Sequence, residues 1–308
     1  MTQSDQRTDS PAPPGLPPVT PPSGRFIAQL FLVPGMIVLV AVLIILGINY
    51  LFIGGNTPQT FLSKLDSDNA DIRWRGASDL AQHIKRPESK LLKADVSFAL
   101  ALAERLRKAI DELDDQEKAL ATKIAPLPQA EQDKAWRKLA PQRDFVEYLT
   151  SALGDFYAPV GVPLLCEIIN RESAADVKGN TMRRRRAIWA LSNLGAQLQV
   201  LAKELTSDQQ AKIQGDLKQE ISGTNSQRKS WALNALYHLD KSAVAKDAPG
   251  LVYVDRAFAQ CAKTQDRFLR LQLAYAFNFW DGELAEPTLL SLARDDGFGT
   301  LIRIEEKD

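Results

Sequence analysis

The feature that most constrains the fold is a weak internal repeat in the second half of the 308-residue chain. Four ten-residue segments align without gaps, at 145–154, 186–195, 228–237 and 269–278. Their ninth position is always large and apolar, and equivalent positions are 41, 42 and 41 residues apart. A constant step of this length predicts stacked helical hairpins, because one hairpin alone cannot bury both of its apolar faces.

Shorter apolar segments alternate with these four and supply the other helix of each hairpin. They lie at 162–169, 210–221, 251–262 and 287–294, with polar stretches such as 178–181 and 222–226 expected as loops. Residues 61–65 and 71–80 resemble one more pair. Apolar residues recur every three or four positions and β-branched alternation is rare, so we expect an all-α protein.

Two of the aligned segments share a recognisable pattern. Arg186-x-x-Trp189-Ala-Leu recurs as Arg228-x-x-Trp231-Ala-Leu. With the 41–42-residue step, this pattern resembles HEAT repeats and the related armadillo-type arrays over about residues 142–298. The resemblance implies a right-handed α-solenoid of helical hairpins that binds protein partners, and it implies no particular chemistry.

The segment at about 87–141 departs from the repeat and is expected to be an irregular insertion. Residues 94–125 predict one long helix, which Pro126 and Pro128 end. Its apolar stripe suits either a coiled-coil dimer or packing within the chain. Packing within the chain is favoured, because Gln116 interrupts a short seam.

A long uncharged stretch precedes the repeats. Residues 30–48 carry no charged side chain and would span about 28 Å as a helix, close to the thickness of a bilayer core. We therefore predict one transmembrane helix at 26–53, after a disordered Pro-rich tail at 1–25 and before a helical domain at 56–308. The stretch is longer than a signal-peptide core, so it is expected to be retained.

The orientation of this span depends on few charges. Arg25 lies directly before it, and the first basic residue after it is Lys64. The positive-inside rule therefore weakly favours a cytoplasmic N-terminus with the main domain outside.

Composition and motifs indicate no catalytic chemistry. Lys+Arg and Asp+Glu both number 38, so no nucleic-acid partner is expected. Cys166 and Cys261 stand in apolar contexts without metal-ligand spacing, which predicts buried, inert thiols. His83 and His238 are expected near helix ends. We expect no catalytic residue, no cofactor and no metal.

One basic cluster is a candidate contact for an anionic partner. It consists of Arg183, Arg184, Arg185 and Arg186, at the expected start of a helix. Such a partner would be lipid headgroups, an acidic protein segment or RNA. The alternative is a solvated helix start in which one arginine bonds a neighbouring repeat.

The aromatic residues are expected in the core for the most part. Trp189 and Trp231 share a repeat position and are predicted to be buried. Trp280 is expected to be partly exposed at a helix end.

Together these features predict a membrane-tethered protein-interaction scaffold or adaptor without catalytic activity, which binds a protein partner on a solenoid surface. The alternatives are an accessory subunit of a membrane enzyme or transport complex, and an enzyme with its site in the 87–141 segment.

Overall fold

The computed structural model describes residues 24–53, 57–171 and 177–294. Over these residues every regular element is a helix, which confirms the all-α prediction. The elements are α1 (Gly24–Ile53), α2 (Pro58–Leu65), α3 (Ala70–His83), η1 (Pro87–Ser89), α4 (Lys90–Lys93), α5 (Val96–Ile124), α6 (Gln129–Arg137), α7 (Ala140–Leu153), α8 (Val162–Asn170), α9 (Val177–Glu204), α10 (Ser207–Ile221), α11 (Ser226–Leu239), α12 (Val254–Cys261), α13 (Arg267–Ala276), η2 (Phe277–Phe279) and α14 (Ala285–Arg294).

The chain divides into two compact units, residues 1–56 and 57–308. The first contains α1, whose described side chains, at 31–45, are all exposed. Within the described residues, no helix combines the length and the apolarity that a membrane crossing requires. The helix predicted at 26–53 is thus present, and its crossing of a membrane stays a prediction. The tail at 1–23 lies outside the described residues.

Among the described residues, side-chain caps begin six α-helices of the second unit. Each capping oxygen accepts a hydrogen bond from a backbone N–H of the first turn, which would otherwise lack a partner. Thr206 and Gln209 form a reciprocal capping box at α10. The other capping residues are Thr57 for α2, Asn69 for α3, Asp95 for α5, Asn225 for α11 and Asp266 for α13.

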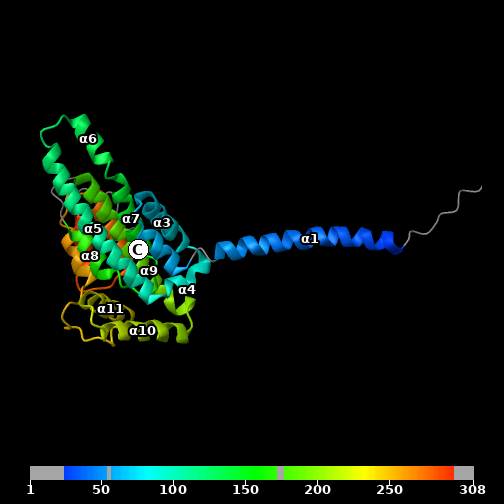
Figure 1. Cartoon of the computed structure of the whole chain (residues 1–308). Helices are drawn as coiled ribbons and strands as arrows, with labels where there is room; N and C mark the ends of the chain where they lie inside the picture. Colours follow the sequence, from blue (N-terminus) through cyan, green and yellow to red (C-terminus); the bar gives the residue numbers. More distant parts are fainter. Residues whose placement is uncertain (1–23, 54–56, 172–176, 295–308) are drawn as a thin grey trace, which may run out of the picture. The chain divides into compact units, whose positions relative to one another are not determined.

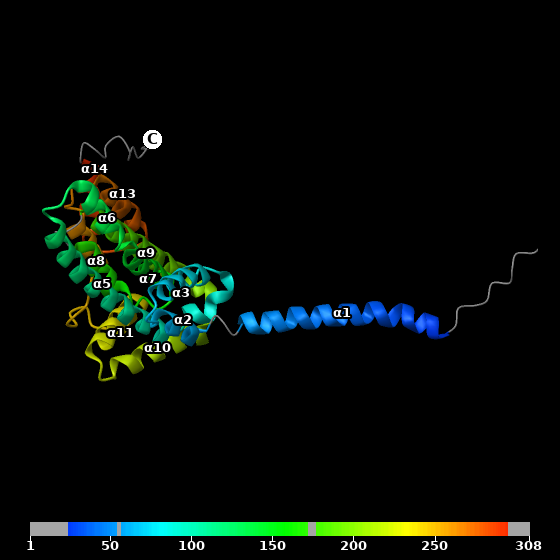
Figure 2. The same cartoon turned by 45° about the horizontal axis from the view of Figure 1, so that its top comes forward.

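Four helices pack side by side in the order α3, α7, α9, α13. Three of them carry the aligned segments 145–154, 186–195 and 269–278. Of the other helices, α5 packs against α7, α8 packs against α9, and α12 packs against α8. Figures 1 and 2 show α3, α7 and α9 as neighbours in both views. We call the four helices the main row.

The hairpin α10–α11 does not join this row. α13 packs against α9, whereas α11 packs against α8 and α5, and α10 also reaches α5. The Arg228 side chain of α11 donates to Glu104 of α5 at 2.9 Å and to Glu220 of α10 at 3.3 Å. The hairpins therefore do not stack in the order of the chain. The expected solenoid is not confirmed, and the all-α class alone is established.

The long helix α5 agrees with the helix predicted at 94–125. It buries most of its apolar stripe, including Leu102, Leu106, Ile110 and Leu113, and it packs against α7. Residues 87–141 therefore contribute directly to the core of the second unit.

Two glycines permit close helix approach. A Cβ at Gly154, after α7, would lie 2.7 Å from the Ala190 Cα of α9. A Cβ at Gly195 of α9 would lie 2.6 Å from the Phe279 Cβ of η2. Next to this contact, the Trp280 indole Nε1 donates to the Leu191 carbonyl at 2.7 Å. These contacts fix α7 and the segment after α13 on either side of α9.

Candidate partner-binding surface

The arginine cluster lies within α9 rather than at its start. α9 begins at Val177, so residues 178–181, expected in a loop, are helical. Successive residues on a helix point about 100° apart. The four consecutive arginines, Arg183 to Arg186, accordingly point in different directions and contact different groups.

Arg183 enters the interior and is 6% exposed. Its Nη1 donates to Asp114 at 2.6 Å and its Nη2 to Glu117 at 2.5 Å, both on α5. Arg184 donates from Nε to the Ile169 carbonyl at 2.7 Å and from Nη2 to Cys261 at 3.2 Å. Both arginines therefore hold helices of this chain together.

Arg185 and Arg186 lie nearer to the surface. Arg185 donates to Asp266 at 3.3 Å, and its guanidinium carbon lies 4.9 Å from the centre of the Phe268 ring. Arg186 donates to Glu147 of α7 at 3.3 Å, and its side chain is 43% exposed. An anionic partner for the cluster stays a prediction, and its most accessible member is Arg186.

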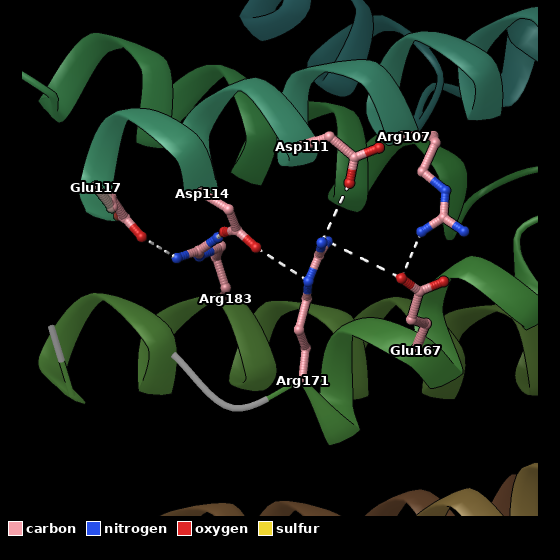
Figure 3. A network of polar contacts seen from close by, with 7 residues as sticks. All are labelled: Arg107, Asp111, Asp114, Glu117, Glu167, Arg171 and Arg183. Atoms are coloured by element: carbon pink, nitrogen blue, oxygen red, sulfur yellow. Dashed lines mark hydrogen bonds and ion pairs between the residues drawn. The ribbon is translucent and has the colours of Figure 1, made fainter. Parts of the chain in front are cut away.

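Arg183 is part of a larger ion-pair network between α5 and the α8–α9 pair. Arg171, which follows α8, donates to Asp114 at 2.9 Å and to Asp111 at 3.1 Å, and lies 3.9 Å from Glu167. Arg107 completes the chain of contacts through Glu167. Figure 3 shows the carboxylates of α5 facing the arginines across this junction.

Glu117 is the most buried member of the network, at 1% exposed. One oxygen accepts from Arg183 and the other accepts from the Nε of Arg143, at 2.9 Å. Four arginines thus meet four carboxylates, namely Arg107, Arg143, Arg171 and Arg183 with Asp111, Asp114, Glu117 and Glu167. The formal charges of the network balance, and its contacts join α5 to α7, α8 and α9.

The outer surface of α9 and α13 carries exposed apolar side chains. Trp189 is 46% exposed and Tyr275 is 49% exposed. Their rings stack, with centroids 6.1 Å apart and planes 12° apart. Phe268 (65%) and Leu271 (41%) lie at helical spacing from Tyr275 and are also exposed. We call these four residues, with Met182 of α9 (44% exposed), the aromatic surface.

The neighbouring helices of the row carry a second aromatic pair. Trp74 of α3 meets Tyr148 of α7 edge to face, with centroids 6.1 Å apart. Both side chains are half-buried. Trp74 and Tyr148 occupy the same repeat position as Trp189, so aromatic residues recur on three helices of the main row.

Two tryptophan predictions are wrong. Trp189 was expected in the core, yet no helix covers it fully. Trp231, at the same repeat position, is 4% exposed, as predicted; its helix α11 packs against α10, α8 and α5. Trp280 was expected to be partly exposed, yet it is 6% exposed because its indole docks on α9. The sequence contains no indication of either outcome, since both depend on which helix packs where.

The remaining candidate groups offer little chemistry. Cys166 and Cys261 are buried free thiols, as predicted, and burial raises the pKa of each. His83 ends α3 and His238 lies one residue before the end of α11. In the described ranges, no group of three or more His, Cys, Asp or Glu side chains is placed to hold a metal ion.

Comparison with known protein families, with curated proteins and with solved structures returns no match for this chain. The resemblance to HEAT repeats therefore stays a prediction.

Proposed function

We propose that the protein is a membrane-tethered, non-catalytic interaction scaffold that binds a protein partner on the aromatic surface. The observation that carries this proposal is the exposed Trp189–Tyr275 stack, flanked by Phe268, Leu271 and Met182. Contiguous exposed apolar side chains are unusual on a soluble monomer and mark interaction sites. Trp, Tyr and Arg are also the residues that dominate binding energies at interfaces.

The partner that fits this surface presents apolar side chains together with carboxylates. Arg185 and Arg186 border the aromatic residues on α9, and Arg267 is exposed at the start of α13. To the described residues Arg186 makes one long hydrogen bond, with Glu147, so an incoming carboxylate can compete for it. Of the anionic partners expected for the arginine cluster, this proposal selects an acidic protein segment.

Membrane attachment through α1 is part of the same proposal. It is supported by the uncharged stretch at 30–48 and by fifteen consecutive exposed residues at 31–45. Exposed apolar surface of this extent needs an apolar environment, and lipid provides one. Arg25 favours a cytoplasmic N-terminus with the helical unit on the other side. Tethering raises the effective concentration of the helical unit toward membrane partners.

The proposal includes a HEAT-like origin for the aligned segments of α7, α9 and α13. The alternative, an accessory subunit of a membrane complex, would use the same surface. An enzyme with its site at 87–141 has less support. Glu117, the buried carboxylate of that segment, already accepts from two arginines.

The test compares two double variants in native membranes. Trp189→Ala/Tyr275→Ala removes the stack, while Leu91→Ala/Leu290→Ala removes two exposed leucines on α4 and α14 (80% and 48% exposed). A photo-crosslinker placed at Phe268 should recover a defined protein partner from the wild type and from the leucine variant, and at least about tenfold less from the aromatic variant. Equal recovery from both double variants, or reproducible absence of a crosslinked protein, would refute the proposal.

A further inference from the structure

A second cleft, separate from the aromatic surface, lies where α11, α12 and the segment after η2 meet. Its volume is about 510 Å³, which suits a small organic molecule. The residues that line it include Tyr237, His238, Tyr253, Asp255, Trp280 and Gly282. None of them belongs to the aromatic surface.

Asp255 is a buried carboxylate in the wall of this cleft, with 6% of the residue exposed. Its Oδ2 accepts a hydrogen bond from the Leu284 backbone N–H at 3.1 Å. Among the described residues, no lysine, arginine or histidine forms an ion pair with it, and Oδ1 accepts no hydrogen bond. Oδ1 is therefore open to a hydrogen bond from a ligand, and a cationic donor would bind it more strongly than a neutral donor.

Gly282 lies directly against this carboxylate. A Cβ at position 282 would be 2.2 Å from the Asp255 Cγ. Only glycine therefore allows the loop after η2 to pass this close to the carboxylate. The loop reduces the access of water to Asp255, which strengthens its attraction for a cation that enters the cleft.

Aromatic rings form much of the rest of the wall. Tyr237 meets Tyr253 edge to face, with centroids 5.8 Å apart, and His238 meets Trp280 in the same way at 5.2 Å. The Arg256 guanidinium carbon lies 4.4 Å from the centre of the Tyr253 ring. The Tyr253 ring therefore already contacts one cation, because the negative face of an aromatic ring attracts positive charge.

The other charged groups of the cleft lie at its exposed rim. They are Lys241, Lys246, Arg256, Asp247, Asp281 and Glu283. His238 adds no positive charge at neutral pH, because burial lowers its pKa to about 4. Among the described residues that line the cleft, Asp255 is the buried acidic or basic side chain besides His238, which disfavours an anionic ligand.

We propose that this cleft binds a primary alkylammonium ion, with the ammonium group against Asp255 and the alkyl chain against the aromatic wall. A primary ammonium fits better than a quaternary one, because Oδ1 is an acceptor that an N–H can satisfy. The site is independent of the partner-binding function proposed above.

Isothermal titration of the full chain in lipid nanodiscs tests the proposal, with n-butylammonium chloride as the probe. Sodium butyrate at the same ionic strength is the control for charge, and empty nanodiscs are the control for partitioning into lipid. We expect saturable binding of butylammonium and none of butyrate. The absence of saturable butylammonium binding up to ~20 mM, or equal binding of both probes, would overturn the proposal.

Two variants locate the site. Asp255→Asn keeps the shape and an oxygen that can accept from Leu284, and is expected to weaken butylammonium binding at least about tenfold. Asp281→Asn removes an exposed carboxylate of the rim and should leave binding within about twofold. Thermal unfolding of Asp255→Asn without ligand checks its fold, and unchanged affinity in that variant would contradict the assignment. If this variant does not fold, the comparison of the two probes on the wild type still decides.

Discussion

Replacing Glu117 by Gln should destabilise the helical unit far more than the same change elsewhere on α5. Glu117 is 1% exposed and accepts from Arg183 at 2.5 Å and from Arg143 at 2.9 Å. The neutral amide keeps the volume and one acceptor oxygen but removes the charge that both guanidinium groups face. Breaking a buried ion pair by removing one partner costs about 3–5 kcal/mol.

The lower end of that range is the better estimate for this site. Arg183 retains Asp114, at 2.6 Å, and the Arg143 guanidinium lies 5.0 Å from the centre of the Trp136 ring. Neither cation is therefore left without any favourable contact. We expect the free energy of unfolding to fall by about 3 kcal/mol.

The control is Glu112→Gln, on the same helix. Glu112 pairs with Lys108 at 3.7 Å, with the two side chains 59% and 79% exposed. An exposed pair of this kind contributes about 0.5 kcal/mol or less. Urea unfolding followed by circular dichroism measures both variants.

A double-mutant cycle with Arg183→Gln isolates the contribution of the pair. The double variant should lose clearly less stability than the sum of the single variants, because neither charge is then left without the other. If the free energies of unfolding of Glu117→Gln and Glu112→Gln differ by less than about 0.5 kcal/mol, the ion-pair network does not stabilise the packing of α5 against its neighbours.

Three further predictions concern packing, pH and thiol chemistry. Gly154→Ala should destabilise the protein by about 1–3 kcal/mol, because its Cβ would meet the α9 backbone at 2.7 Å. Gly215→Ala in α10, where the Cβ meets open space, should instead stabilise the protein by about 0.5–1 kcal/mol. Urea unfolding distinguishes the two variants. Burial lowers the pKa of His238 from its ordinary 6.5 to about 4, so between these pH values the unfolded chain binds more protons than the folded chain. The contribution of neutral His238 to the free energy of unfolding should be fully present above pH 6.5 and fall as the pH is lowered to 4, by at most about 3 kcal/mol. His238→Gln should show a smaller fall when urea unfolding is measured at each pH. Cys166 and Cys261 are buried and their thiol pKa values are raised, so both should resist a thiol reagent in the native protein and react at once in denaturant; fast native labelling would show that the α8–α12 packing opens.

Some features of the protein follow from its sequence alone. The spacing of apolar residues located the helices α7, α9, α11 and α13, and the two prolines after residue 125 located the end of α5. The missing ligand patterns around both cysteines indicated buried thiols. These inferences succeed because helix periodicity and helix-ending residues act over a few neighbouring positions.

The placement of the helices required the tertiary structure. Trp189 and Trp231 occupy the same repeat position, yet Trp189 is exposed on the main row and Trp231 is buried on α11. Arg183 belongs to a run of four arginines, yet it alone reaches the carboxylates of α5. Asp255 has no feature in the sequence that marks it as a buried charge.

The physical reason is the same in each case. A sequence pattern shows which face of a helix is apolar, whereas burial depends on which helix, distant in the chain, covers that face. The repeat predicted α11 beside α9, but α13 takes that place because Gly195 allows close approach and Trp280 bonds the α9 backbone. The position of α13 beside α9 decides where the aromatic surface lies, whereas the sequence by itself determined the helices that carry this surface.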